Sequence, residues 1–378
     1  MIPVNEPLLN GREKELLAQC IDTGWISSDG PFVKEFEEKF SKYIGVKYGV
    51  AVCNGTAALE AALYGAGIKK GDQIIMPSFT IISCAIAALR LGAKPVLVDI
   101  DPETWNMDVS QIESKITPKT KFVMPVHVYG HPVDMDTLFE LAEKYDLKIV
   151  EDAAEVHGAE YFSEVKGNKW LKCGSMGDVA AFSFYANKII TTGEGGMVMT
   201  NDPAVAERAA SYRNLCFKPE KRFYHTELGY NFRMTNLQAA IGVAQIERIE
   251  EFISIKRSLG EYYRHRLSYI QGVRFQVEKP YARSVYWMYS IELDESSGIN
   301  AQTMMNKLKD REIGTRPFFM GLHAQPVLRE MGLFKNEKYP NTDRAYKQGL
   351  YLPSGLTLTR PQIDTVCSAI DKIMRKGG

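Results

Sequence analysis

The sequence predicts an α/β protein: a large domain with a mostly parallel seven-stranded sheet flanked by helices, and a smaller C-terminal α+β domain. The chain has 378 residues, more than the roughly 250 to 300 over which a single core keeps growing, so two domains are expected. Between residues 48 and 215, short β-branched segments alternate with alanine- and leucine-rich helical ones, as in a parallel sheet wrapped by helices. After residue 236 this alternation stops.

Seven short apolar segments supply the strands of the large sheet, and helical segments separate them. The expected strands are residues 49–53, 73–76, 95–99, 122–127, 148–151, 179–184 and 197–200. Residues 56–64 and 136–145 are expected to form two of the intervening helices. We therefore assign residues 1–250, with the N-terminal segment, to the large domain.

The last third of the chain has longer helical patterns and fewer strands. One long helix is expected over residues 237–267, then a strand-like segment at 286–293, a helix near 301–311 and a final amphipathic helix over 361–376. This pattern predicts that residues 251–378 form the smaller α+β domain.

The composition argues against several classes of function. The 46 basic residues balance 46 acidic ones, and a formal net charge of +0 disfavours a nucleic-acid or polybasic membrane surface. The six cysteines form no CxxC motif, so reduced thiols are expected. The N-terminal segment lacks the apolar core of a secretory signal, and no segment has the apolar length of a membrane span. A cytoplasmic protein is expected.

The first of three candidate loops follows the first predicted strand. Ligands of doubly wound sheets bind at the carboxyl ends of the strands, so functional residues are expected in these loops. Asn54-Gly55-Thr56-Ala57 opens a helix here, and glycine together with the free N–H groups of a helix start can bind a phosphate. An N-cap made by Asn54 or Thr56 without any ligand explains the tetrapeptide equally well.

The second loop contains Glu151 and Asp152 at the end of a buried strand, followed by Glu155. Only one of the two adjacent carboxylates can face a given ligand, because side chains alternate along a strand. A buried carboxylate needs a cationic partner, and a protonated pyridine nitrogen is one such partner. A solvated strand end or a salt bridge to an arginine is the alternative.

The third loop contains Lys188. An apolar segment that includes Ser183 precedes this lysine, and a glycine-rich turn at residues 193–196 follows it. A lone lysine at a sheet edge is usually solvated. In a partly apolar pocket, however, a lysine has a lowered pKa and can form a Schiff base with an aldehyde. A phosphate cradle, a carboxylate and a lysine in this chain order are the parts that pyridoxal phosphate requires.

Longer motifs give these residues a family context. They are GWISSDGPFVKEFEEKF, NGTAAL, EDAAEVHGA, SFYANKIITTGEGG and GYNFRMTNLQAAIG. In this order, and over nearly the whole chain, they resemble the pyridoxal-phosphate-dependent nucleotide-sugar aminotransferases of the DegT/DnrJ/EryC/StrS type, in the fold-type I aspartate aminotransferase superfamily. Within that family ETWNMD, PVHVYGHPVDM, YWM and TRPFF are most similar to perosamine synthases, which aminate GDP-4-keto-6-deoxymannose.

The resemblance implies a role for each motif. Lys188 would carry the Schiff base and move the proton, Asp152 would keep the pyridine nitrogen protonated, and Glu155 would lie near the phenolic oxygen. The implied phosphate-side residues are Gly55, Thr56, Ala57 and Ser183, joined by Asn231 from a second subunit. Arg233 would brace the Asn231 loop or contact a substrate phosphate. The implied substrate contacts are Trp25, Ile26 and Ser27, with Arg316, Phe318 and His323 from the loop 316–323.

One position departs from the family pattern. Relatives commonly place an aromatic residue directly after PSFT to stack on the pyridine ring, whereas this chain has Ile81 there. We expect apolar packing from Ile81 to cover the ring, with Phe79, two positions earlier on the same strand face, as a further contributor.

No metal site is expected. His127 and His131 have the i, i+4 spacing of a zinc pair on a helix, but residues 128–130 are typical of a strand that enters a turn. The GEGG segment lacks the GK[ST] ending with which a P-loop holds phosphate and magnesium.

The predicted activity is transfer of an amino group from glutamate to C4 of a nucleotide-linked 4-keto-6-deoxysugar. GDP-4-keto-6-deoxymannose is the first choice of substrate, giving GDP-perosamine for surface glycans; UDP- or dTDP-linked 4-keto or 3-keto sugars are the alternative. Two further alternatives are a pyridoxal-phosphate sugar dehydratase, disfavoured by Lys188 because such relatives carry histidine there, and a non-catalytic cofactor-binding regulator. The resemblance also implies a homodimer with shared active sites.

Overall fold

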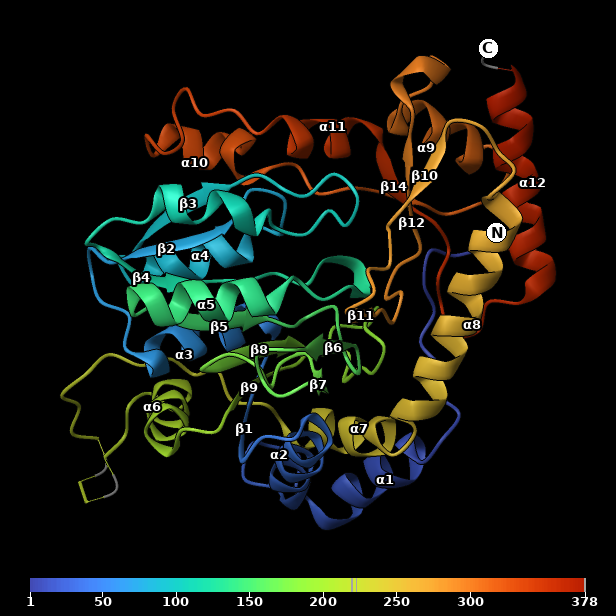
Figure 1. Cartoon of the computed structure of the whole chain (residues 1–378). Coiled ribbons are helices and arrows are strands. Elements are labelled where there is room, and N and C mark those ends of the chain that lie inside the picture. Colours follow the sequence, from blue (N-terminus) through green and yellow to red (C-terminus); the bar gives the residue numbers. More distant parts are fainter. Residues whose placement is uncertain (219, 222, 377–378) are drawn as a thin grey trace.

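The computed structural model describes residues 1–218, 220–221 and 223–376, and it confirms the predicted α/β architecture (Figure 1). Seven strands form the large sheet in the order β1-β9-β8-β5-β4-β2-β3. From β8 to β3 all neighbours pair in parallel, whereas β9 pairs antiparallel with both β1 and β8. The strands are Tyr48–Val52 (β1), Gln73–Pro77 (β2), Lys94–Val98 (β3), Thr120–Val123 (β4), Lys148–Asp152 (β5), Val179–Ser183 (β8) and Gly196–Thr200 (β9).

Each of the seven predicted strands overlaps an observed one. Strands of a sheet that is covered on both faces are continuous apolar runs, which makes them visible in the sequence. The largest difference is at β4, which ends at Val123 although a strand was expected to continue to residue 127. Beyond that point the chain meets β5 only through an isolated bridge between Val126 and Asp152.

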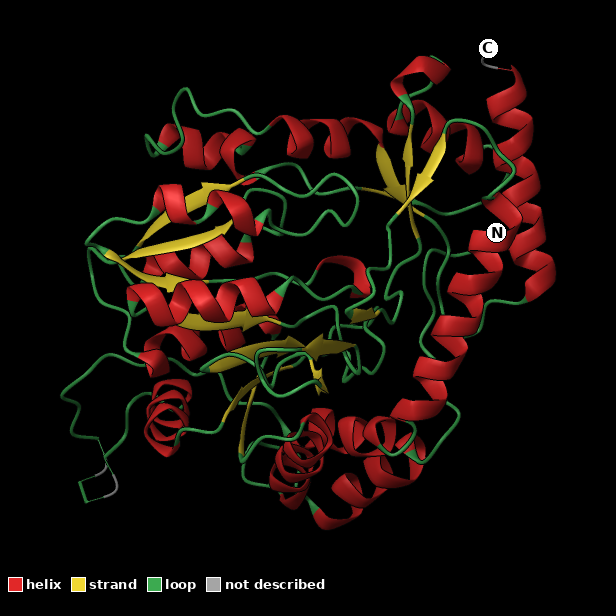
Figure 2. Ribbon diagram, viewed as in Figure 1, coloured by secondary structure: helices red, strands yellow, loops and turns green. Residues whose placement is uncertain are grey.

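Helices cover both faces of the large sheet (Figures 1 and 2). Successive side chains of β5 point to opposite faces of the sheet. Val150 packs into the core that contains α3 (Gly55–Ala66), whereas Ile149 packs into a separate core with α5 (Met135–Tyr145). The other helices in this part of the chain are α1 (Glu13–Thr23), α2 (Pro31–Ile44), α4 (Ser83–Arg90), α6 (Pro203–Arg213) and α7 (Asn236–Ile246).

A second sheet with its own core lies in the C-terminal part of the chain. Its strands, in order, are β10 (Val273–Phe275), β12 (Ser290–Leu293), β14 (Gly349–Tyr351) and β13 (Arg316–Pro317). The helices that share its core are α8 (Ile249–Leu267), α9 (Ala301–Lys309) and α12 (Arg360–Lys376). The proposed domain boundary after residue 250 falls at the start of α8 and stays a prediction.

Two further groups of elements connect these parts. A small sheet has the order β11-β6-β7, formed by Ala282–Arg283 (β11), Glu160–Ser163 (β6) and Lys169–Lys172 (β7). Two helices from the C-terminal part, α10 (Pro326–Glu330) and α11 (Pro340–Gln348), contribute Leu328 and Ala345 to the core of the large sheet.

Two sequence predictions for the C-terminal part are wrong in extent. The helix expected over residues 237–267 is two helices, α7 and α8, because Arg248 adopts φ −118° and ψ 12° and ends the first helical run. The strand expected over 286–293 is confined to β12, because Tyr286 adopts φ 46°, which an extended strand does not accommodate.

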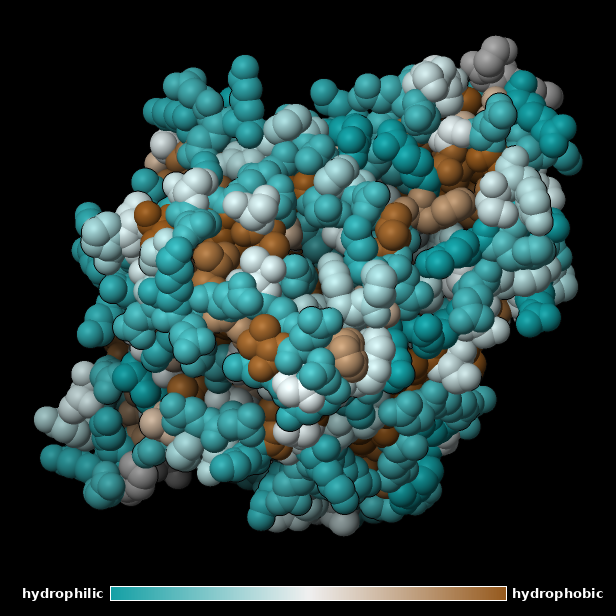
Figure 3. Space-filling view, viewed as in Figure 1, coloured by the Kyte–Doolittle hydropathy of each residue, from teal (hydrophilic) through white to brown (hydrophobic). Residues whose placement is uncertain are grey.

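The face of the molecule in Figure 3 is mainly hydrophilic, with apolar side chains scattered in small groups. Of the helices in the described part of the chain, none is long and apolar enough to cross a membrane. All six cysteines are free, as expected.

Candidate functional site

A cavity of about 710 Å³ opens at the carboxyl ends of β1, β5 and β8, beside the first turn of α3. This is the sheet edge at which ligands of such folds bind, and the volume is typical of small-molecule sites. Eight of the nine residues predicted to hold the cofactor line it: Gly55, Thr56, Ala57, Ile81, Asp152, Glu155, Ser183 and Lys188. Segments far apart in the sequence therefore meet in one site.

The first turn of α3 forms a cradle for an anion. Asn54 caps the helix: its side chain accepts a hydrogen bond from the backbone N–H of Ala57 at 2.9 Å. The N-cap expected as the alternative to a phosphate site is therefore present, and it lies at the same helix start that lines the cavity. The hydroxyl of Thr56 is 2.8 Å from that of Ser83. A Cβ added at Gly55 would lie 2.8 Å from the Cβ of Ser183, so only glycine lets these two elements approach this closely.

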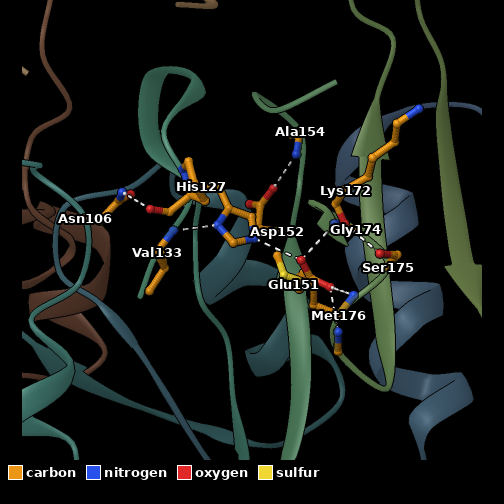
Figure 4. A network of polar contacts seen from close by, with 12 residues as sticks. Asn106, His127, Val133, Glu151, Asp152, Ala154, Lys172, Gly174, Ser175 and Met176 are labelled. Carbon is orange, nitrogen blue, oxygen red and sulfur yellow. Dashed lines mark hydrogen bonds and ion pairs between the residues drawn. The ribbon is translucent and has the colours of Figure 1, made fainter. Parts of the chain in front are cut away.

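The two adjacent carboxylates of β5 face opposite sides of the sheet, as the alternation predicted. Glu151 points away from the cavity and accepts backbone N–H groups of Gly174, Met176 and Gly177 (Figure 4). It also pairs with the Nε2 of His127 at 3.0 Å. This internal network leaves Asp152 as the carboxylate at the cavity.

Asp152 is held by two donors from its own side of the sheet. The thiol of Cys84, in the first turn of α4, donates to Oδ2 at 3.1 Å, and the backbone N–H of Ala154 donates to Oδ1 at 3.1 Å. Burial, followed by the charge of Asp152, raises the pKa of the Cys84 thiol well above its usual value. The sulfur therefore keeps its proton and serves as a hydrogen-bond donor that orients Asp152.

Lys188 reaches the same cavity from the loop after β8. Its Nζ lies 3.6 Å from Oε1 of Glu155 and 3.6 Å from the centroid of the Trp287 ring. Burial lowers the pKa of Lys188, and the charges of Glu155 and Asp152 act in the opposite direction. Burial also raises the pKa of Glu155 to about 7, against the effect of Lys188 and of the Tyr129 backbone N–H. Burial thus acts on both members of this pair in favour of their neutral forms.

These residues fit pyridoxal phosphate. The backbone N–H groups at the start of α3 suit an anion, and Gly55 lets Ser183 approach this helix start closely. Asp152 is 3% exposed, carries no described cation within ion-pair distance, and would suit a pyridine nitrogen that bears a proton. Lys188 supplies the amine that the aldehyde needs.

The structure places the other cofactor-related residues as follows. Ile81 lines the cavity with 46% of its surface exposed. Phe79 does not line it: this residue follows the end of β2 and packs against Tyr129 and Phe318. The expectation that Phe79 helps to cover the ring has no support, because the strand face on which it relied ends at Pro77.

The loop that carries Asn231 and Arg233 lies beside the cavity. Asn231 is exposed and pairs with Asn214 through a single bridge, without lining the cavity of its own chain. Arg233 donates to the side chain of Asn214. Within the chain, Arg233 therefore contacts the residue that pairs with Asn231. This contact is consistent with bracing of the Asn231 loop, one of the two roles expected for Arg233.

None of the predicted substrate contacts lines the cavity of this chain. Trp25, Ile26 and Ser27 are exposed, at the turn between α1 and α2. Arg316 is exposed and pairs in register with Tyr351, which lines the cavity.

Phe318 and His323 are turned inward. Phe318 is 2% exposed and packs on Trp105 and Tyr129. His323 contacts the hydroxyl of Ser78 at 2.7 Å and Asp343 at 3.2 Å, which joins its loop to the end of β2. Within the described chain these two side chains serve packing and bracing, and substrate contact by the set stays a prediction.

Several lining residues had no place in the predicted site. They include Thr80, Ser83, Tyr185, Asn187, Trp287, Phe319 and Tyr351. The YWM motif contained a signal for Trp287, but nothing in the local sequence shows that this ring reaches a lysine 99 positions earlier. Such contacts depend on how the C-terminal part folds back on the sheet.

His127 and His131 both make hydrogen bonds within the protein. Val133 donates its backbone N–H to Nδ1 of His127, so Nε2 carries the proton and donates to Glu151. His131 contacts Asn106 and the carbonyl of Pro132. Across the described residues no group of three or more metal-binding side chains occurs.

Comparison with known proteins supports the cofactor and the chemistry. The model of the DegT/DnrJ/EryC1/StrS aminotransferase family matches residues 7–371. The GDP-perosamine synthase of Caulobacter vibrioides is 40% identical over 377 residues, which cover 99% of this chain and 98% of that relative. The GDP-perosamine synthase of Escherichia coli O157:H7 is 40% identical over 371 residues, or 98% of each chain.

A solved structure agrees with these matches. The crystal structure of DesV from S. venezuelae aligns with a TM-score of 0.87 and 32% identity, over 96% of this chain and 94% of that one. The predicted fold, the aminotransferase chemistry and the pyridoxal-phosphate cofactor are thereby confirmed. The chain belongs to the DegT/DnrJ/EryC1/StrS aminotransferase family.

Proposed function

We propose that this enzyme transfers the amino group of glutamate to C4 of GDP-4-keto-6-deoxymannose and forms GDP-perosamine. The observation that carries the chemistry is the placement of Lys188 in one cavity with Asp152 and the anion cradle at Gly55. The choice of sugar rests on the two relatives that share 40% identity over nearly the full length. A product of this kind would serve the assembly of surface glycans.

The bound cofactor supplies an aldehyde that condenses with amines and a protonated ring that accepts electrons. Asp152 would bind the pyridine nitrogen and keep its proton in place, with Cys84 and Ala154 fixing the carboxylate. The N–H groups at the start of α3, with Thr56 and Ser183, would hold the phosphate. These contacts would hold the cofactor in the cavity that Lys188 also lines.

Lys188 would act as the proton carrier. In the first half-reaction its Nζ takes the proton from Cα of glutamate, and in the second it delivers a proton to C4 of the sugar. Burial lowers the pKa of Lys188, which favours the neutral amine that a proton acceptor needs. Glu155, at 3.6 Å and with a pKa of about 7, would stabilise the protonated amine.

We further propose that the active unit is a homodimer in which Asn231 completes the phosphate site of the second subunit. The support is its exposure and its position outside the cavity of its own chain. The alternatives of a UDP- or dTDP-linked sugar, or of amination at C3, leave this arrangement and the chemistry unchanged.

A substrate panel tests the choice of sugar. The purified enzyme is given glutamate with GDP-, UDP- and dTDP-linked 4-keto-6-deoxysugars, and products are identified by mass spectrometry and NMR. We expect the highest kcat/KM with GDP-4-keto-6-deoxymannose and a nitrogen at C4. A higher kcat/KM with another nucleotide, or nitrogen at C3, would overturn the substrate assignment.

The Lys188→Ala variant is the control for the chemistry. It should keep the cradle and Asp152 and still bind pyridoxal phosphate, but it should lose turnover with every sugar of the panel. Borohydride should fix the cofactor covalently to Lys188 in the wild type, which a peptide mass spectrum would show. Near-normal transamination by the variant would contradict the proposed role of Lys188.

A further inference from the structure

Lys188 lies between a carboxylate and the face of an aromatic ring. Its Nζ is 3.6 Å from Glu155 Oε1 on one side and 3.6 Å from the Trp287 ring centroid on the other. Its side chain is only 10% exposed. A desolvated ammonium is attracted to the electron-rich face of an indole. The ring thus opposes the effect of burial, which by itself favours the neutral amine.

The indole of Trp287 is fixed by a hydrogen bond and by packing. Its Nε1 donates to the carbonyl oxygen of Asn187 at 2.7 Å, and that carbonyl directly precedes Lys188 in the chain. Asn5, in the N-terminal segment, donates to the same oxygen at 3.2 Å. The indole is 4% exposed and stacks at 6.3 Å from the ring of Tyr129. Trp287 therefore contacts both the peptide group before Lys188 and the amine of Lys188.

The backbone of Trp287 is held by a second buried lysine. Lys256, on α8, is 3% exposed, and its Nζ donates to the carbonyl oxygen of Trp287 at 2.6 Å and to that of Ser354. Burial lowers the pKa of Lys256 to about 7, and no charged group among the described residues opposes this shift. A buried amine with this environment is costly, so a role for its two hydrogen bonds is expected.

We propose that Trp287 is a positioning residue for Lys188, whose indole face holds the amine and raises its proton affinity, and that Lys256 anchors Trp287 for this purpose. The ionisable groups that face Lys188 are Glu155, Asp152 and His157. The indole of Trp287 carries no charge, so its effect can be removed without changing a charge. The inference rests on the proposed role of Lys188, but it can be tested without turnover.

The test measures the reactivity of Lys188 in the full-length protein after its cofactor has been removed with hydroxylamine. Acetic anhydride acylates only neutral amines, so the rate of labelling at Lys188, followed by mass spectrometry across a pH series, reports its pKa. Trp287→Leu removes the ring face and should speed labelling at neutral pH by about tenfold. Trp287→Phe keeps a ring face and should stay within about twofold of the wild type.

Matched variants separate positioning from general disturbance. Tyr43→Leu removes the ring that lies 3.5 Å from Lys172, neither of which lines the cavity, and should leave Lys188 labelling unchanged. Lys256→Met removes the anchor at similar volume and should speed Lys188 labelling in the same direction as Trp287→Leu.

Each outcome bears on one part of the inference. Equal labelling of Lys188 in the wild type and Trp287→Leu would overturn the role of the ring, and wild-type labelling in Lys256→Met would overturn the anchor. If a variant fails to fold without cofactor, the midpoint of the pH dependence of the holoenzyme's visible absorbance replaces the labelling. It should fall in Trp287→Leu, and an unchanged midpoint would contradict the inference. None of these results would affect the aminotransferase proposal.

Discussion

His157 lies in an aromatic cluster beneath the site. The side chain is fully buried, and its ring lies 5.2 Å from Phe182, 5.6 Å from Phe184 and 6.1 Å from Phe40. Burial, followed by the charge of Lys188, lowers the pKa of His157 to about 3. The ring therefore stays neutral across the physiological range and acts as a packing residue.

This depressed pKa predicts a loss of stability in acid. In the unfolded chain the histidine binds a proton below its usual pKa of about 6.5, whereas the folded chain does not bind one until about pH 3. The unfolded state therefore gains protons, and stability falls, as the pH drops through this window. Between about pH 7 and pH 5 the wild type should lose about 2 kcal/mol more unfolding free energy than His157→Phe. Urea unfolding at the two pH values measures the difference.

Exposed His225 supplies the control. His225→Phe should show the wild-type pH dependence, because that side chain lies at the surface. The absolute stability of His157→Phe carries no information on this point, since a larger ring also changes the packing. Parallel pH curves for the wild type and His157→Phe would contradict the assignment of a neutral, buried ring.

Single residues of the site were predictable to different degrees. Asp152 and Lys188 follow apolar strands, so their position at the sheet edge can be read from local sequence. Trp287 comes from the C-terminal part of the chain, and its contact with Lys188 depends on tertiary packing. His323 contacts the hydroxyl of Ser78 within the chain, a contact that the local sequence does not reveal, and its predicted substrate contact stays a prediction.

At the scale of elements, the start of α3 decides whether the anion cradle is open. The added Cβ at Gly55 would come within 2.8 Å of Ser183 Cβ, closer than side-chain atoms tolerate. Gly55→Ala must therefore displace α3 from β8 and should weaken pyridoxal-phosphate binding by about tenfold. Cofactor titration followed by absorbance measures this affinity.

Gly11→Ala is the matched substitution away from the site. The nearest neighbours of its added Cβ would be side-chain atoms of Arg248 and Glu13 at 3.3 Å, a separation that requires shifts of only a few tenths of an ångström. We expect wild-type cofactor affinity for this variant. Undiminished affinity in Gly55→Ala would show that α3 and β8 can separate without harm to the cradle.

Element prediction succeeded where one pattern dominates. The strands of the large sheet are apolar on both faces, so each was found within a few residues. The direction of β9 was not predictable, because antiparallel pairing with β1 and β8 leaves no mark on its composition. The break at Arg248 lies inside a helical pattern and carries no glycine or proline to reveal it.

At the scale of the whole molecule, the segment that precedes Asn231 exposes several large apolar side chains. Leu228 is 88% exposed, Tyr224 53% and Tyr230 45%. Apolar side chains grouped next to a functional loop are typical of a surface that another chain covers. The exposure of this segment and the position of Asn231 outside its own cavity support the proposed homodimer.

Mixed dimers test whether the sites are shared. Lys188→Ala chains keep Asn231, and Asn231→Ala chains keep Lys188, so each homodimer has two defective sites. In a dimer of one chain of each kind, one site combines the intact Lys188 with the intact Asn231, and the other has neither. An equal mixture after subunit exchange should therefore recover about one quarter of wild-type activity, since half of the dimers are mixed and half of their sites are intact. Native mass spectrometry verifies the exchange. If both residues served the same chain's site, no mixture would contain an intact site, and activity would stay at the level of the separate variants despite complete exchange.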